Sequence, residues 1–229
     1  IRLIIYLESE PEHRINYSDV MPSTWVAHRR LAIWESLKGY AIARTTPMSS
    51  VHDDLVALGS IGGDGTSVTR LAWSPRLREA YGWLTARCEE IGLEVEVDAA
   101  GNLIARWQVG DGPAVVIGSH IDTVPSGGRY DGALGVVGGL HAIRMLKRRG
   151  VQPRRPVWLI AFMDEENTRF GTALFGSRAF VGEPFTNLAD RRDRDGISVA
   201  DAMATWDRDP ARLADARRGV VEAAGVVAH

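Results

Sequence analysis

The chain has 229 residues, of which 45% are hydrophobic and 24% are charged, with 27 basic and 29 acidic side chains. This composition is typical of a soluble globular protein with one large core or two small ones. A formal net charge of -2 gives no global field for nucleic acid. No apolar run reaches the roughly 18 residues needed to span a bilayer. We therefore expect neither a nucleic-acid partner nor a membrane partner.

Cys88 is the single cysteine of the chain. It excludes an internal disulfide framework and a metal cluster held by thiolates within one chain, and it makes a reducing cytoplasm the simplest location. Any metal site must therefore use His, Asp and Glu side chains.

Residues 1–47 show neither clear periodicity nor the layout of a signal peptide, because the apolar start IRLIIYL is followed at once by ESEPEH. We interpret them as an atypical N-terminal extension, which is either lineage-specific or translated upstream sequence that is not native, with Met48 as a candidate true start. A helical pattern of apolar residues then runs from Val51 to Leu58 and ends at Gly59.

Ser74 and Pro75 are typical of a helix start, and the apolar spacing predicts an amphipathic helix over 75–91. Cys88 lies on its apolar stripe, so we expect a buried structural thiol rather than a nucleophile. After this helix, LEVEVD alternates as a half-buried strand, and LIARW is its expected hairpin partner across an Ala-Gly-Asn turn.

Two continuously apolar runs, over 113–120 and 156–166, are typical of central strands covered on both faces. Between them, residues 132–150 carry an apolar stripe and basic residues in the last turn, which predicts a helix. Strand, helix and strand form a βαβ unit, so the predicted fold class is α/β. Ligands of such sheets bind beyond the carboxyl ends of the strands.

The C-terminal stretch ARLADARRGVVEAAGVVAH is predicted to run as a polar helix into a small-residue apolar segment. It stops at His229 with no polar tail, which favours a chain that is cut short. Of the other histidines, His141 is expected to be a packed or half-exposed residue of the helix over 132–150.

Ionisable residues follow both central strands. His120 and Asp122 come after the first and suit a metal-binding imidazole with a carboxylate that orients it. Asp131 lies in the following loop and can bridge two cations. Glu165 and Glu166 come after the second strand, where one can bind metal and the other take a proton from water.

Each of these pieces alone is commonly a solvated turn or a wet surface, and the glycines around Asp131 can be simple turn glycines. Their shared position just past buried strands favours a metal site, because randomly placed surface charges are not expected to cluster at the ends of buried strands.

The segments GSHIDTVPSGGRYDGALGVVGGL and FMDEENTRFGTALFGSRAFVG closely resemble dinuclear zinc amidohydrolases related to aminoacylase and carboxypeptidase. The branch that they resemble contains allantoate amidohydrolase, N-carbamoyl-L-amino-acid hydrolase and beta-ureidopropionase. The resemblance implies a zinc-exopeptidase-like, three-layer α/β/α fold with a mixed, largely parallel central sheet. Residues 48–229 would then be the N-terminal part of the catalytic domain, without the lid and dimerisation domain or the C-terminal part.

The resemblance also implies the roles of the site residues. His120 would bind one zinc, Asp131 would bridge both, and Glu166 would bind the other. Asp122 would hold the ring of His120, and Glu165 would be the general base that takes the proton of a metal-activated water.

His229 stands where relatives have a further histidine ligand, in a His-Ile-Glu-Gln-Gly segment after a short strand. We assign it as the partner of His120 on the same zinc. The chain ends before the rest of that segment.

The implied activity is hydrolysis of a carbamoyl or ureido C–N bond, in N-carbamoyl-L-amino acids or allantoate, with two divalent ions that are zinc, or else manganese or cobalt. Full-length relatives would be homodimers.

Aminoacylases and dipeptidases carry the same motifs, although the Gly-Gly-Arg-Tyr-Asp-Gly loop favours the carbamoyl branch. The alternative outside the enzyme class is that the chain is an inactive fragment or a piece of a split or frameshifted gene. We expect this 229-residue form alone to be poorly active.

Overall fold

The computed structural model describes residues 3–5, 49–217 and 226–228. Two compact units are present, residues 1–7 with 50–229 and residues 8–49, and the fold below is that of the first. His229 and nearly all of the expected extension over 1–47 lie outside the described residues. None of the described helices is both long and apolar enough to cross a membrane.

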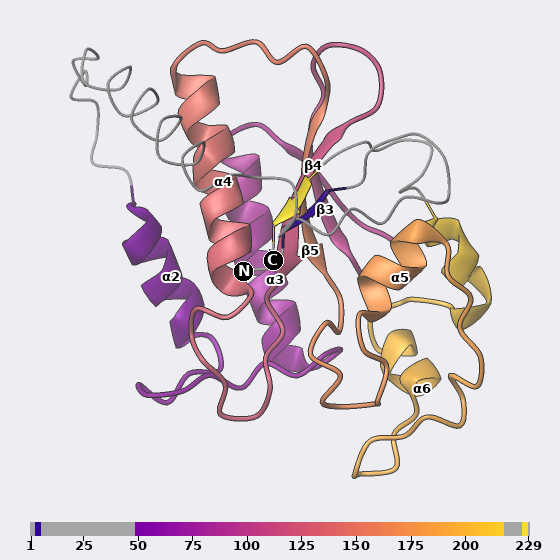
Figure 1. Ribbon diagram of the computed structural model, residues 1–229. Helices are drawn as coiled ribbons and strands as arrows, with labels where there is room; N and C mark the ends of the chain where they lie inside the picture. Colours follow the sequence, from indigo (N-terminus) through magenta and orange to yellow (C-terminus); the bar gives the residue numbers. More distant parts are fainter. Residues whose placement is uncertain (1–2, 6–48, 218–225, 229) are drawn as a thin grey trace, which may run out of the picture. The chain divides into compact units, whose positions relative to one another are not determined.

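From α2 to β5 the elements follow the predicted order of helices and strands. With the labels of Figure 1, they are β1 (Leu3–Ile5), α2 (Val51–Ser60), α3 (Pro75–Glu89), β2 (Glu94–Val97), β3 (Leu103–Trp107), β4 (Val115–His120), α4 (Ala133–Arg148), β5 (Val157–Phe162), α5 (Phe175–Val181), α6 (Val199–Ala204), a 3₁₀ helix (Pro210–Ala216) and β6 (Val226–Ala228).

Four strands form the central sheet in the order β2-β3-β5-β4, and β1 pairs with β6 in a separate antiparallel ladder. The β2–β3 hairpin is antiparallel as predicted. Strands β4 and β5, which precede and follow α4 in the chain, pair in parallel. Strand β3 is antiparallel to β5. The described sheet is therefore mixed as predicted, but it is not largely parallel. Of its three described strand pairs, β2–β3 and β3–β5 are antiparallel, and the parallel pair is the β4–β5 pair that the βαβ pattern predicted.

Helices lie on both faces of this sheet, which gives the expected α/β/α layers (Figure 1). On one face, apolar residues of α3 and α4 pack with the alternate strand residues Leu103, Leu159 and Ala161. On the other face, the intervening residues pack with Phe180 of α5; they are Ile104, Trp158, Ile160 and Phe162. This alternation follows from the two-residue period of a strand.

Helix α3 begins as predicted, because the side chain of Ser74 accepts a hydrogen bond from the N–H of Leu77 and Pro75 occupies the first turn. Cys88 is fully buried on the inner face of this helix. Burial raises the pKa of its thiol to about 12, as expected for a structural cysteine.

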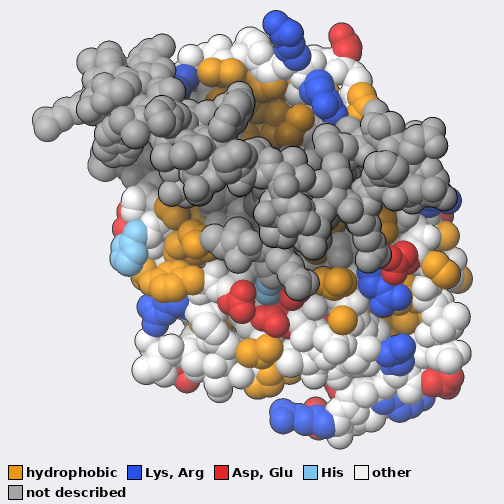
Figure 2. All heavy atoms as spheres, in the orientation of Figure 1, with side chains coloured by type: hydrophobic (Ala, Val, Ile, Leu, Met, Phe, Trp, Pro, Cys, Tyr) orange, Lys and Arg blue, Asp and Glu red, His pale blue; other side chains and the backbone are white. Residues whose placement is uncertain are grey.

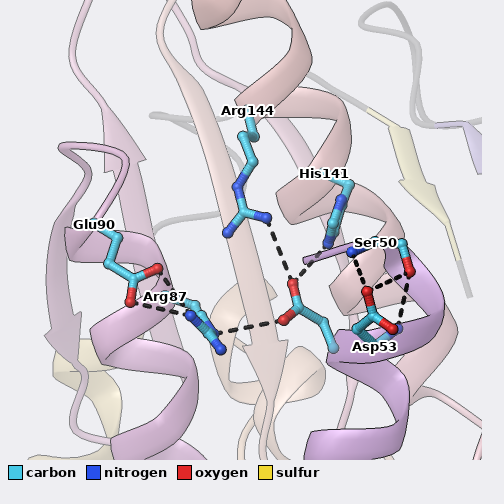
Figure 3. Close-up of polar contacts among 7 residues, drawn as sticks. Ser50, Asp53, Arg87, Glu90, His141 and Arg144 are labelled. Carbon is cyan, nitrogen blue, oxygen red and sulfur yellow. Dashed lines mark hydrogen bonds and ion pairs between the residues drawn. The ribbon is translucent and has the colours of Figure 1, made fainter. Parts of the chain in front are cut away.

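Helix α2 docks on α3 and α4 through a buried carboxylate, shown in Figure 3. His141 Nε2 lies 2.7 Å from Asp54 Oδ2, and Arg144 Nη1 lies 3.5 Å from the same oxygen. Arg87 of α3 approaches Asp54 Oδ1 at 3.5 Å. We call these four residues the Asp54 cluster. His141 is thus a packed helix residue, as predicted.

The polar helix predicted after Pro210 differs in kind from the observed element. Pro210–Ala216 form a 3₁₀ helix, and Arg217 leaves it with an extended backbone. Ala216 is the buried residue of this segment. A short helix costs more to nucleate than its few hydrogen bonds return, so a segment with little packing takes the tighter 3₁₀ form.

Candidate metal centre

The parallel pairing of β4 and β5 brings the two ionisable segments together. His120, the last residue of β4, lies opposite Phe162, the last residue of β5. The loops that follow both strands therefore start from the same edge of the sheet, where ligands of α/β proteins bind.

Three of the predicted metal ligands meet at this edge. His120, Asp131 and Glu166 each offer one ligand atom, and these atoms lie within 4.8 Å of one another. We call these three residues the candidate metal centre. Figure 2 shows acidic side chains gathered beside a histidine on the face that it draws. One imidazole with two carboxylates is a donor set that suits zinc, manganese or cobalt.

The hydrogen bonding of His120 prepares its ring for a metal. Its Nδ1 lies 3.0 Å from the backbone oxygen of Asp122. A carbonyl oxygen only accepts, so Nδ1 carries the hydrogen and the lone pair lies on Nε2. Nε2 lies 3.6 Å from Oε2 of Glu165, the expected base.

Asp122 joins the two loops in a different way from the one that the sequence suggested. Its backbone carbonyl, rather than its carboxylate, accepts the hydrogen bond from the His120 ring, and its Oδ1 is 3.8 Å from Nδ1. The carboxylate instead accepts hydrogen bonds of 3.4 Å from the backbone N–H groups of Glu165 and Glu166. One buried residue therefore fixes the position of the imidazole relative to the backbone of both glutamates.

The backbone on either side of the two glutamates adopts a left-handed conformation, with φ of 54° at Asp164 and 60° at Asn167. Asn167 Oδ1 accepts from the N–H of Ala173 at 2.8 Å, and the Thr172 hydroxyl donates to the Asp164 carboxylate. Asp and Asn tolerate this conformation through such local bonds, and backbone strain of this kind concentrates at functional sites. The roles of Asp164 and Thr172 were missed from the sequence, although Asp164 opens the acidic triplet.

Gly132 leaves room for the metal-binding edge of His120. Its φ is 60°, and a Cβ built there would lie 2.4 Å from His120 Nε2. From the sequence, Gly132 was only a candidate turn glycine. The fixed tautomer, the clearance at Gly132 and the donor set together fit a divalent cation.

Burial raises the pKa of the Asp122 carboxyl to about 7, against the opposing effect of the two backbone N–H groups that it accepts. Burial likewise raises the pKa of Asp164 to about 7, and the charge of Asp122 adds to this effect. Carboxylates crowded in a low-dielectric site need a compensating positive charge, which a bound cation provides.

The metal-free chain should lose stability as the pH rises. Both buried carboxyls keep their protons to about pH 7 in the fold, whereas unfolding returns them to the ordinary value of 3.8. The folded state therefore binds more protons than the unfolded state between these values, so the free energy of unfolding falls as the pH rises across this window. Urea unfolding at about pH 5 and pH 8 measures it, and added zinc should remove most of the fall. A flat profile without metal would contradict the expectation.

Comparisons with known proteins follow the same segments. The sequence profile of peptidase family M28 matches residues 102–201. An N-carbamoyl-L-amino acid amidohydrolase from Geobacillus stearothermophilus is 40% identical over 74% of this chain and 42% of its own length. A ureidoglycolate hydrolase from Oryza sativa subsp. japonica is 41% identical over 59% of this chain and 29% of its own.

A solved structure of a hydantoinase/carbamoylase family amidase from Burkholderia ambifaria is similar to this chain with a TM-score of 0.66. It is 33% identical over 75% of this chain and 42% of that one. The chain is thus similar in sequence and fold to proteins of this amidohydrolase branch over about three quarters of its own length. It spans about 42% of the length of the bacterial relatives named here.

Proposed function

We propose that the protein is a metal-dependent amidohydrolase that cleaves a C–N bond of a carbamoyl or ureido group with an activated water. The observation that carries this proposal is the meeting of His120, Asp131 and Glu166 within 4.8 Å. Glu165 Oε2 lies 3.6 Å from the nitrogen of His120 that faces this group. Metal ligands and a carboxylate base at that spacing are the parts that amide hydrolysis requires.

A bound divalent cation supplies the Lewis acidity that polarises the carbonyl and makes water acidic enough to attack near neutral pH. The side chains of this site do the rest. Glu165 takes the proton of the attacking water, whose oxygen joins the carbonyl carbon. Glu165 then returns the proton to the departing nitrogen as the C–N bond breaks. Asp122 keeps Glu165 in place by accepting its backbone N–H.

The substrates we propose are N-carbamoyl-L-amino acids or allantoate, with zinc as the metal, two ions per site shared by Asp131, and His229 as a further ligand. The names of the relatives support this class. Aminoacylase or dipeptidase chemistry is the alternative within the same site. A homodimer in the cytoplasm completes the proposal, and the single cysteine is compatible with a reducing compartment.

The test is metal-dependent release of ammonia or amine by the purified chain, supplied with zinc or manganese. The panel contains N-carbamoyl amino acids, allantoate, N-carbamoyl-beta-alanine, N-acetyl amino acids and dipeptides. We expect low but measurable turnover of one carbamoyl or ureido substrate. Glu165→Gln should lower it by about a hundredfold or more, because the amide cannot take the proton.

The Glu165→Gln variant is also its own control for metal binding, since Glu165 lies outside the candidate metal centre. We expect its zinc affinity to stay close to that of the parent chain. Turnover confined to N-acetyl amino acids or dipeptides would select the alternative. Zinc binding with no turnover of any substrate would overturn the proposed activity while leaving the metal centre standing.

A further inference from the structure

Arg70 is fully buried, which is unusual for an arginine. Its guanidinium donates from Nε to the backbone oxygen of Ile121 at 2.9 Å. From Nη1 it donates to the backbone oxygens of Leu58 and Ile61 at 2.8 and 3.0 Å. One side chain therefore ties the end of α2 to the turn between His120 and Asp122.

The main chain of Arg70 contacts the same turn. Its N–H donates to Thr123 Oγ1 at 2.9 Å, and its carbonyl accepts from the N–H of Thr123 at 2.9 Å. The Thr123 hydroxyl also donates to the backbone oxygen of Val68 at 3.1 Å.

These bonds hold both peptide groups that flank Asp122. The carbonyl of Ile121 belongs to the peptide before Asp122 and accepts from the side chain of Arg70. The N–H of Thr123 belongs to the peptide after Asp122 and donates to the backbone of Arg70. The carbonyl of that second peptide is the one that receives the ring Nδ1 of His120. The orientation of the imidazole thus depends on a peptide plane that Arg70 fixes.

Charge links the same two residues. The oxygens that accept hydrogen bonds from the guanidinium belong to neutral carbonyls, so the negative charge that compensates this buried cation must come from another group. Burial lowers the pKa of the Arg70 guanidinium to about 10, and Asp122, when it is ionised, opposes this effect. Arg70 therefore stays charged at neutral pH beside the residue that it holds.

We propose that Arg70 is a positioning residue of the candidate metal centre, which sets the direction of the His120 ring and of the Asp122 carboxylate through the two peptides around Asp122. This inference rests on the proposed function. A lysine cannot replace the arginine, because one ammonium does not reproduce a planar fork that reaches three carbonyls in fixed directions.

The test uses Co²⁺ alone as the probe, with its affinity and its visible absorption spectrum as readouts. We expect Arg70→Met to weaken Co²⁺ binding by about tenfold to a hundredfold and to change the spectrum, because the ligand geometry changes. Arg70→Lys should recover part of the stability toward urea but little of the affinity.

The matched control is Arg144→Met, which removes another buried arginine, one that forms an ion pair with Asp54 of α2. It should lower stability toward urea and leave the Co²⁺ spectrum unchanged. A merely structural role for Arg70 would give both arginine variants the same behaviour.

Folded Arg70 variants with parental affinity and spectrum would overturn the inference. If Arg70→Met does not fold, Arg70→Lys carries the test. If neither arginine variant folds, Thr123→Val carries the test, because it removes the hydroxyl that accepts a hydrogen bond from the N–H of Arg70. Unchanged Co²⁺ binding by the Thr123→Val variant would also overturn the inference. A parent chain that binds no Co²⁺ would refute the proposed metal centre itself, and the inference with it.

Discussion

Gly132→Ala is expected to abolish metal binding, and hydrolysis with it, in a chain that still folds. The new Cβ would lie 2.4 Å from His120 Nε2 and 2.5 Å from both ring carbons beside it. No Cβ tolerates such a contact, and the backbone of Gly132 is held as the N-cap of α4, so the imidazole is the group that must move. The metal-binding Nε2 would then leave the direction that the hydrogen bond from Nδ1 to the Asp122 carbonyl sets for the ring.

The φ of 60° at Gly132 adds strain for any residue with a side chain, of about 1–2 kcal/mol. The total effect on zinc affinity should exceed about a hundredfold, beyond the loss typical of a residue that only supports a ligand. Isothermal titration with zinc measures it, beside a far-UV spectrum that reports folding.

Gly128→Ala is the matched control in the same loop. A Cβ at Gly128 would meet nothing within 4 Å, so this variant should bind zinc like the parent chain. If Gly132→Ala binds zinc with parental affinity, the ring of His120 does not need the clearance that we ascribe to Gly132.

Much of the fold and of the candidate metal centre was predictable, because strong local patterns coincide with the site. Continuous apolar runs ending in ionisable residues mark β4 and β5, and the helix between them forces their parallel pairing. Once two such strands lie side by side, His120 and Glu166 must come close, so spacing in the sequence carries information about distance in space.

The remaining features depend on contacts that no local pattern encodes. Arg70 stands in a polar stretch typical of an exposed loop, and its burial follows from three backbone carbonyls that converge only in the fold. The hydrogen bond from the His120 ring to the Asp122 carbonyl likewise depends on the orientation of a peptide group, which no local sequence pattern encodes. The left-handed φ of 60° at Asn167 also follows from the fold of this loop, and asparagine tolerates that conformation better than most residues do.

Asp54→Asn should destabilise the protein by about 3 kcal/mol, through the charges that it leaves behind in the Asp54 cluster. Asp54 is fully buried, and the side chain of Arg144 is 6% exposed. The neutral amide keeps the shape of the side chain but no longer compensates Arg144 or Arg87. Since a domain is typically stable by only about 5–15 kcal/mol, this loss is a large fraction of the total. Urea unfolding of parent and variant measures it.

Asp53→Asn is the control, because Asp53 is the neighbour of Asp54 on α2 but is exposed and hydrogen-bonds to Ser50 in the capping box (Figure 3). It should be far less destabilising than Asp54→Asn. The double variant Asp54→Asn with Arg144→Met separates charge from shape: if an uncompensated arginine causes the loss, removing that arginine should return part of the stability. Additive losses in the double variant would show instead that Asp54 acts through packing or through His141.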